Sequence, residues 1–132
     1  MATSEDDRRG RHLVWCDSLG GLMAGTLGWI VAPWLGPWYD LPVNLMRFIA
    51  TVNLIYGTYS LLLALSPVRK RWRVLFLIAS NTAWVGVCWI LAAVYWSRAN
   101  AFGVTHLIAE GAVVGAIAAV EWRFRHLMWN DD

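Results

Sequence analysis

Apolar residues fall in four long windows along the chain, and polar residues separate these windows. Asp17, Arg47 and Glu110 are the single charged residues of the windows 13–34, 41–66 and 99–120, and the window 74–97 has none. An α-helix rises 1.5 Å per residue, so about 20 residues cross a hydrocarbon layer of roughly 30 Å. Each window is long enough to do so. The pattern predicts transmembrane helices over about 13–34, 42–66, 73–97 and 101–121.

The connections between the windows are short and contain residues that end helices. Pro37 to Pro42, Ser66–Pro67 and Asn100 to Gly103 occupy these connections. Consecutive helices joined by short loops pack as antiparallel neighbours. We therefore expect an all-α fold, an integral membrane four-helix bundle with up-down-up-down order, as a single domain over 12–128. Residues 1–11 mix acidic residues with arginines and have no apolar period, which predicts a disordered cytoplasmic tail.

Composition supports a membrane location. Of the 132 residues 58% are hydrophobic and only 15% are charged, and ten are tryptophan. A soluble core of this size cannot hide so much apolar surface, which excludes a disordered chain, a disulfide scaffold and a conventional water-soluble enzyme. The formal net charge is only +2. With no soluble basic surface, nucleic-acid binding is not expected.

The basic residues predict the orientation, because Lys and Arg of short loops stay in the cytoplasm. The side that carries most of them holds Arg8, Arg9, Arg11, Arg69, Lys70, Arg71, Arg73, Arg123 and Arg125. The other side has Arg98 alone, with Arg47 inside a span. Both termini are therefore expected in the cytoplasm. Tryptophans favour the headgroup level and are expected at both interfaces, at Trp15, Trp72, Trp122 and Trp129 inside and Trp34, Trp38 and Trp96 outside.

Polar residues within the spans are the only candidates for chemistry, because a charge in hydrocarbon costs at least ~2.5 kcal/mol. They predict a buried polar cluster of Arg47, Asn53, Asn81, His106 and Glu110. Glu110 lies near the middle of its span, with His106 one turn away and Glu121 on the same face. Arg47 falls at a similar depth, which predicts an Arg47–Glu110 ion pair. Such a pair either fixes helix register or belongs to a proton or ion pathway.

His106 has two possible roles. A histidine within a span can ligate haem or a chlorophyll-type pigment. No second ligand lies at a matching depth, so no metal site is predicted, and a hydrogen-bonding core residue is the commoner role for such a histidine. No cofactor is required by the sequence.

Small residues indicate where helices approach closely. Gly21 and Gly25 form one Gly-x-x-x-Gly motif, and Gly111 and Gly115 form another. Both motifs are expected at helix–helix contacts, either within the bundle or against a partner subunit or a second copy.

The second half of the chain contains the runs ASNTAWV (79–85), GVTHLIAE (103–110) and AAVEWR (118–123). These three runs resemble a family of small bacterial four-helix membrane proteins with no assigned activity. Asn81 stands where that family has an acidic residue. The resemblance implies a bacterial inner-membrane protein, and it marks Asn81, Trp84, His106 and Glu110 as positions that the fold uses.

The sequence leaves three functional classes open. The first is a non-catalytic accessory subunit of a larger respiratory or photosynthetic membrane complex, docked through small-residue and Trp-rich faces that include Trp84 and Trp89. The second is a small homo-oligomeric transporter or channel that uses Glu110, and the third is a haem- or pigment-binding protein that uses His106. No nucleophile elbow, zinc-protease motif or phosphate loop is present in the sequence, so catalysis is not expected. The expected partners are membrane lipids and other integral membrane subunits or further copies of the chain.

Overall fold

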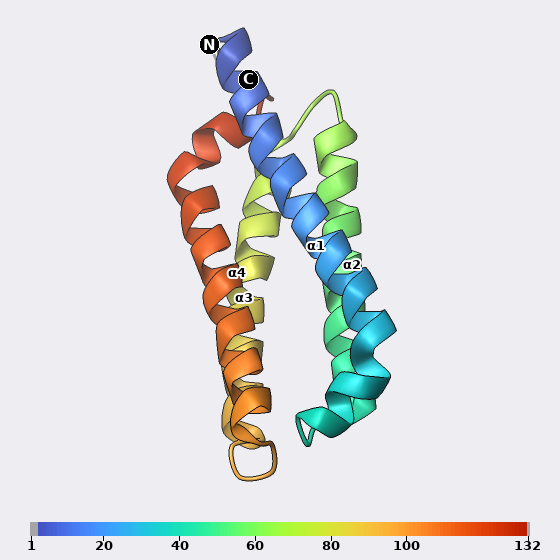
Figure 1. Cartoon of the computed structure of the whole chain (residues 1–132). Coiled ribbons are helices and arrows are strands. Elements are labelled where there is room, and N and C mark those ends of the chain that lie inside the picture. The colour runs from blue at the N-terminus through green and yellow to red at the C-terminus, as the bar shows by residue number, and fades with distance from the viewer. Residues whose placement is uncertain (1–2, 132) are drawn as a thin grey trace.

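The computed structural model describes residues 3–131 and folds this part of the chain into four α-helices without a β-strand. The helices are α1 (Ser4–Trp38), α2 (Val43–Leu65), α3 (Arg71–Val94) and α4 (Ala101–Met128). They run antiparallel to their neighbours in sequence, and both termini lie at the same end as the α2–α3 loop (Figure 1). All four are long and apolar enough to cross a membrane. The prediction of an all-α chain with four such helices is confirmed for these residues, and the chain has the helices of a multi-pass membrane protein.

Helix α1 begins at Ser4, so residues 4–11 are helical where a disordered tail was predicted. The Thr3 hydroxyl accepts a hydrogen bond from the Asp6 backbone N–H at 3.1 Å, and the Asp6 carboxylate accepts one from the Thr3 N–H at 3.3 Å. This reciprocal cap satisfies two backbone donors. Glu5 pairs with Arg9 one turn later at 2.6 Å. The mixture of acidic and basic residues that suggested disorder therefore supports the first turns of a helix.

At the end of the bundle opposite the termini, Asn100 joins the two hairpin loops. Its side chain caps α4 by accepting from the Gly103 N–H at 3.0 Å, and its amide donates to the Trp38 carbonyl at 2.5 Å. Its backbone N–H donates to the Tyr39 carbonyl at 3.1 Å. Asp40 has a φ of 55°, a left-handed conformation that Asp tolerates better than most residues. Asn100 thus holds the α1–α2 and α3–α4 hairpins together.

At the other end, a set of polar residues that we name the terminal latch (Asp7, Arg69 and Asn130) closes the bundle. The Arg69 side chain is fully buried, and it donates to the Met128 carbonyl at 2.7 Å and to the Asp7 carboxylate at 2.5 Å. The Asn130 amide donates to the same Asp7 oxygen at 3.1 Å, and its carbonyl accepts from the Arg69 N–H at 2.6 Å. The latch joins α1, the α2–α3 loop and the segment after α4.

Glycines allow the helices to approach. A Cβ on Gly25 would lie 2.8 Å from the Ala50 carbonyl oxygen of α2, and one on Gly21 would lie 3.0 Å from the Gly57 Cα. A Cβ on Gly111 would lie 2.6 Å from the Trp89 Nε1 of α3, whereas one on Gly115 would lie 3.5 Å from its nearest neighbour, an ordinary contact. The first motif therefore lies in the α1–α2 contact, and in the second motif only Gly111 is in close contact.

The buried apolar side chains form two clusters. One lies toward the end of the bundle with the α1–α2 and α3–α4 loops, which we name the loop end, and it includes Met46, Trp84 and Leu107. The other lies toward the termini and includes Val14 and Leu77. The outward faces of the helices also carry large apolar side chains, among them Trp34, Ile55 and Ile90. A bundle that is apolar outside as well as inside suits a lipid environment.

Candidate functional site

Glu110 of α4 is held by groups from three helices. Its Oε1 accepts from the Asn53 amide of α2 at 2.9 Å and from the Trp84 indole N–H of α3 at 3.4 Å. Its Oε2 lies 3.5 Å from His106 Nε2, one turn away on α4. Only 16% of the Glu110 side chain is exposed. Asn53, Trp84 and His106 thus hold a carboxyl group in the interior without a lysine or arginine partner within the described residues.

His106 continues this group of contacts toward the loop end. Its Nδ1 lies 3.4 Å from the Tyr39 hydroxyl, and the two rings are 5.3 Å apart. Tyr39 caps the C-terminus of α1. Tyr39, His106 and Glu110 therefore form a row of titratable groups that leads from the loop end into the bundle.

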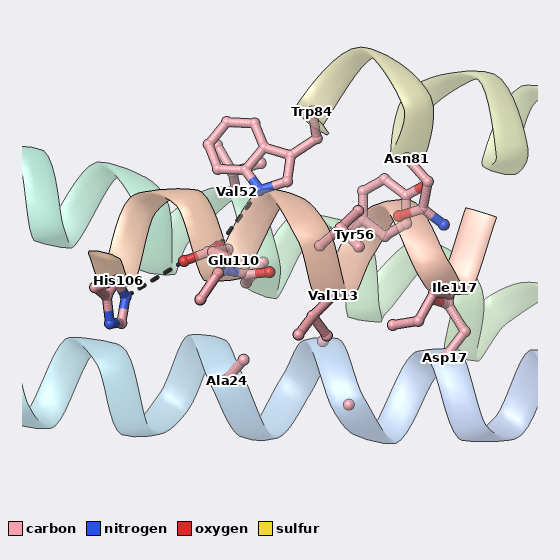
Figure 2. Close-up of a pocket in the computed structure, with 15 residues that line it drawn as sticks. Asp17, Ala24, Val52, Tyr56, Asn81, Trp84, His106, Glu110, Val113 and Ile117 are labelled. Carbon is pink, nitrogen blue, oxygen red and sulfur yellow. Dashed lines mark hydrogen bonds and ion pairs between the residues drawn. The ribbon is translucent and has the colours of Figure 1, made fainter. Parts of the chain in front are cut away.

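A cavity of about 340 Å³ adjoins Glu110, and we name it the central cavity. Glu110 and His106 line one end, Asp17 and Asn81 line the other, and the Trp84 and Tyr56 rings lie between them (Figure 2). The rest of the wall is apolar and comes mainly from small and branched residues of α1 and α4: Gly20, Gly21, Ala24, Val52, Ala109, Val113, Val114 and Ile117. Concave sites of this size, with an apolar wall and a few polar groups, are typical of small-molecule sites.

Apart from Glu110, a pair of carboxyl groups lies nearer the termini, Asp17 of α1 and Glu121 of α4. Both residues are buried. Asp17 accepts a short hydrogen bond from the Ser60 hydroxyl of α2, and Glu121 accepts from the Asn81 amide of α3 at 2.9 Å. Each helix contributes one residue to this group. We name it the carboxyl pair site (Asp17, Ser60, Asn81 and Glu121).

Arg47 does not pair with Glu110, so the predicted ion pair is wrong. Its guanidinium lies over the Trp29 ring at 5.3 Å from the centroid, and its Nε has no hydrogen-bond partner among the described residues. Trp29 belongs to α1, so Arg47 lies at the α1–α2 contact while Glu110 faces α2 and α3 from α4. Equal depth along the membrane normal does not fix the side of a helix on which a residue lies.

The structure thus divides the five predicted polar residues among three places. Asn53, His106 and Glu110 come together, Asn81 binds Glu121 while also lining the central cavity, and Arg47 lies apart. The carboxyl pair site was not predicted as a site. Two signals pointed to it: Asp17 is the only charged residue of its apolar window, and Glu121 shares a helix face with Glu110.

Both ring nitrogens of His106 face protein partners, Glu110 on one side and Tyr39 on the other. Ligation of a haem iron or a pigment metal would break one of these contacts. No group of three or more His, Cys, Asp or Glu side chains placed to hold a metal ion occurs within residues 3–131. These surroundings do not fit His106 as an axial ligand.

Trp84 and Trp89 also differ in placement. Trp84 is buried and turned toward Glu110, whereas the Trp89 side chain is half exposed on the outer face of α3. Of these two residues, only Trp89 is available to contact a partner subunit.

Comparison of the chain with protein-family models, with curated proteins and with solved structures gives no match in any of the three. The resemblance to a small bacterial membrane family stays a prediction, as do the bacterial inner membrane and the orientation of the termini.

Proposed function

We propose that this protein is a small membrane transporter or channel in which Glu110 binds the transported proton. The observation that carries the proposal is the position of Glu110 between a cavity and a row of titratable groups. A buried carboxyl group without a lysine or arginine partner is costly within a membrane, and such residues are therefore candidates for a function. The Asn53 and Trp84 donors stabilise the charged form of Glu110, and His106 lies close enough to exchange a proton with it.

The path has two parts. At the loop end, a proton reaches His106 Nδ1 beside the Tyr39 hydroxyl. His106 then passes a proton from Nε2 to Glu110 Oε2. From Glu110 it enters the central cavity, which has room for on the order of ten water molecules at roughly 30 Å³ each. Asp17 and Asn81 supply polar groups at the far end of that cavity. The path therefore extends through both halves of the bundle.

Proton flux into liposomes that contain the purified protein and a pH-sensitive dye tests this proposal. With a potassium diffusion potential applied, we expect wild-type flux above that of protein-free liposomes and at least a tenfold decrease for Glu110→Gln. Glu5→Gln is the matched control, because this carboxyl is exposed on the first turns of α1. A wild-type flux equal to that of empty liposomes, or an unchanged flux in folded Glu110→Gln, contradicts the proposal.

The accessory-subunit hypothesis stays a prediction. Burial of Trp84 removes one of the two mid-span tryptophans that it assigned to a docking face. Purification from native membranes in mild detergent tests it, because stoichiometric larger partners are expected for an accessory subunit. A protein that conducts protons when purified alone favours transport.

A further inference from the structure

The carboxyl pair site brings two acidic side chains together with no basic side chain beside them in the described structure. Asp17 and Glu121 receive their side-chain hydrogen bonds from neutral groups, the Ser60 hydroxyl and the Asn81 amide. No Lys, Arg or His side chain of residues 3–131 lies within ion-pair distance of either carboxyl group. Two carboxyl groups placed together in an apolar interior cannot both ionise unless a positive charge lies between them; otherwise one of them keeps its proton.

Glu121 also has a free acceptor. The residue is only 2% exposed, and its Oε1 has no hydrogen-bond donor within the described part of the chain. Buried carboxylate oxygens are normally satisfied, and an unsatisfied one is costly. A donor that reaches Oε1 from outside the protein would therefore bind favourably.

A cavity distinct from the central one is lined by both residues of the pair. Its volume is about 330 Å³, and Asp17 and Glu121 are its only charged walls. The remaining walls are apolar side chains and one thiol: Leu13, Cys16, Ala116, Ile117 and Val120. Cys16, Ala116 and Val120 are exposed, so the cavity opens on the outer surface between α1 and α4. We name it the lateral cavity.

We propose that the lateral cavity binds a small organic ammonium ion that enters from the lipid. The ammonium group lies between Asp17 and Glu121 and donates an N–H to Glu121 Oε1, and the apolar body of the ligand lies against Ile117 and Val120. Charge selects the cation, the unsatisfied oxygen selects an N–H donor, and the apolar wall selects an organic body. A metal ion would find too few oxygen ligands, because hard cations prefer six or more.

This inference goes beyond the proton path, because it concerns a different cavity and does not require Glu110. The two cavities share Asp17 and Ile117 as walls, so they are adjacent along α1 and α4. A ligand at Asp17 would stand at the end of the central cavity. The ammonium site is tested separately from proton flux.

The test is calorimetric titration of the purified full-length protein in detergent with 2-phenylethylammonium, compared with 2-phenylethanol, a neutral ligand of similar size. We expect the ammonium to bind at least tenfold more tightly than the alcohol, and Glu121→Gln to weaken ammonium binding at least tenfold. Glu5→Gln and Glu110→Gln are expected to leave ammonium affinity within about twofold. Loss of proton flux in Glu110→Gln with retained ammonium binding would separate the two proposals.

A second pair of variants avoids the buried carboxyl groups. Ala116→Trp places a large ring at the mouth of the lateral cavity, and Ala119→Trp places the same ring at an exposed position outside the cavity. We expect only Ala116→Trp to lose ammonium binding. Equal affinity for the ammonium and the alcohol, no detectable ammonium binding, or full affinity in Glu121→Gln or Ala116→Trp would overturn the proposal.

Discussion

At the scale of single residues, Gly10 is the position where the backbone leaves least room. A Cβ on Gly10 would lie 1.7 Å from the Leu127 carbonyl oxygen, so only glycine allows α1 and α4 to cross there. The contact is between backbones, and no flexible side chain can move aside to relieve it. Gly10 therefore fixes how closely the two ends of the chain approach.

We expect Gly10→Ala to lower the free energy of unfolding by about 1–3 kcal/mol, because the helices must separate to admit the methyl group. Gly86→Ala is the control, since nothing lies within 4 Å of a Cβ at that exposed position of α3. It is expected to raise stability by about 0.5–1 kcal/mol through lower chain entropy. Unfolding of the two variants in mixed detergent micelles measures the difference, and equal stabilities would show that the crossing is not tight.

At the scale of elements, the terminal latch determines how α1, the α2–α3 loop and the segment after α4 stay together. Arg69 supplies its only positive charge, and that charge is fully buried. The hydrogen bond from Arg69 lowers the pKa of Asp7 below its usual value, and the positive charges of Arg69 and Arg11 lower it further. Asp7 lies in the charged turns that precede the apolar stretch of α1, where water reaches a third of its side chain.

A lowered pKa in the folded state means that ionised Asp7 stabilises the fold above the unfolded pKa of about 3.9. This contribution is lost as the pH falls from there through the lower folded pKa. We expect Asp7→Asn to lower Tm by about 4 °C at pH 6 and by less near pH 3, because a partly exposed pair contributes about 1 kcal/mol or less. Thermal unfolding in detergent across this range measures it. Glu5→Gln serves as the control, and an Asp7→Asn deficit that does not shrink in acid would contradict the role of the charge.

At the scale of the whole molecule, the four helices place the α1–α2 and α3–α4 loops at one end and the termini with the α2–α3 loop at the other (Figure 1). Arginines and a lysine crowd the end with the termini, and Arg98 is the only basic residue of the two opposite loops. The basic end is expected to remain in the cytoplasm.

We therefore expect a cysteine at Asp40 to react with an impermeant thiol reagent in intact cells, and one at Lys70 to react only after permeabilisation. The native thiols are first replaced by Cys16→Ser and Cys88→Ser, so that the reagent labels only the introduced cysteine. The reverse labelling pattern would invert the orientation. Reaction at both positions in intact cells would contradict a membrane-spanning bundle.

The number of helices and their order could be predicted from the amino-acid sequence alone. These depend on the length of apolar windows and on prolines and glycines between them, which act locally. The prediction failed locally at 4–11, where the Thr3 cap and the Glu5–Arg9 pair turn a charged segment into helix. It also placed Gly21 and Gly25 on a packing face, because small residues mark close approach whatever the partner helix is.

Which polar groups meet depends on how the helices pack against one another, and this could not be predicted from the sequence. Arg47 and Glu110 have matching depths, but rotation of α2 about its axis places Arg47 on Trp29 and brings Asn53 to Glu110. The same effect joins Asp17 to Ser60 and Glu121 to Asn81, two contacts between residues distant in sequence. Depth follows from counting residues along one helix. Which sides of two helices face each other depends on how all four helices pack. The cavities beside Glu110 and Glu121 arise from that packing.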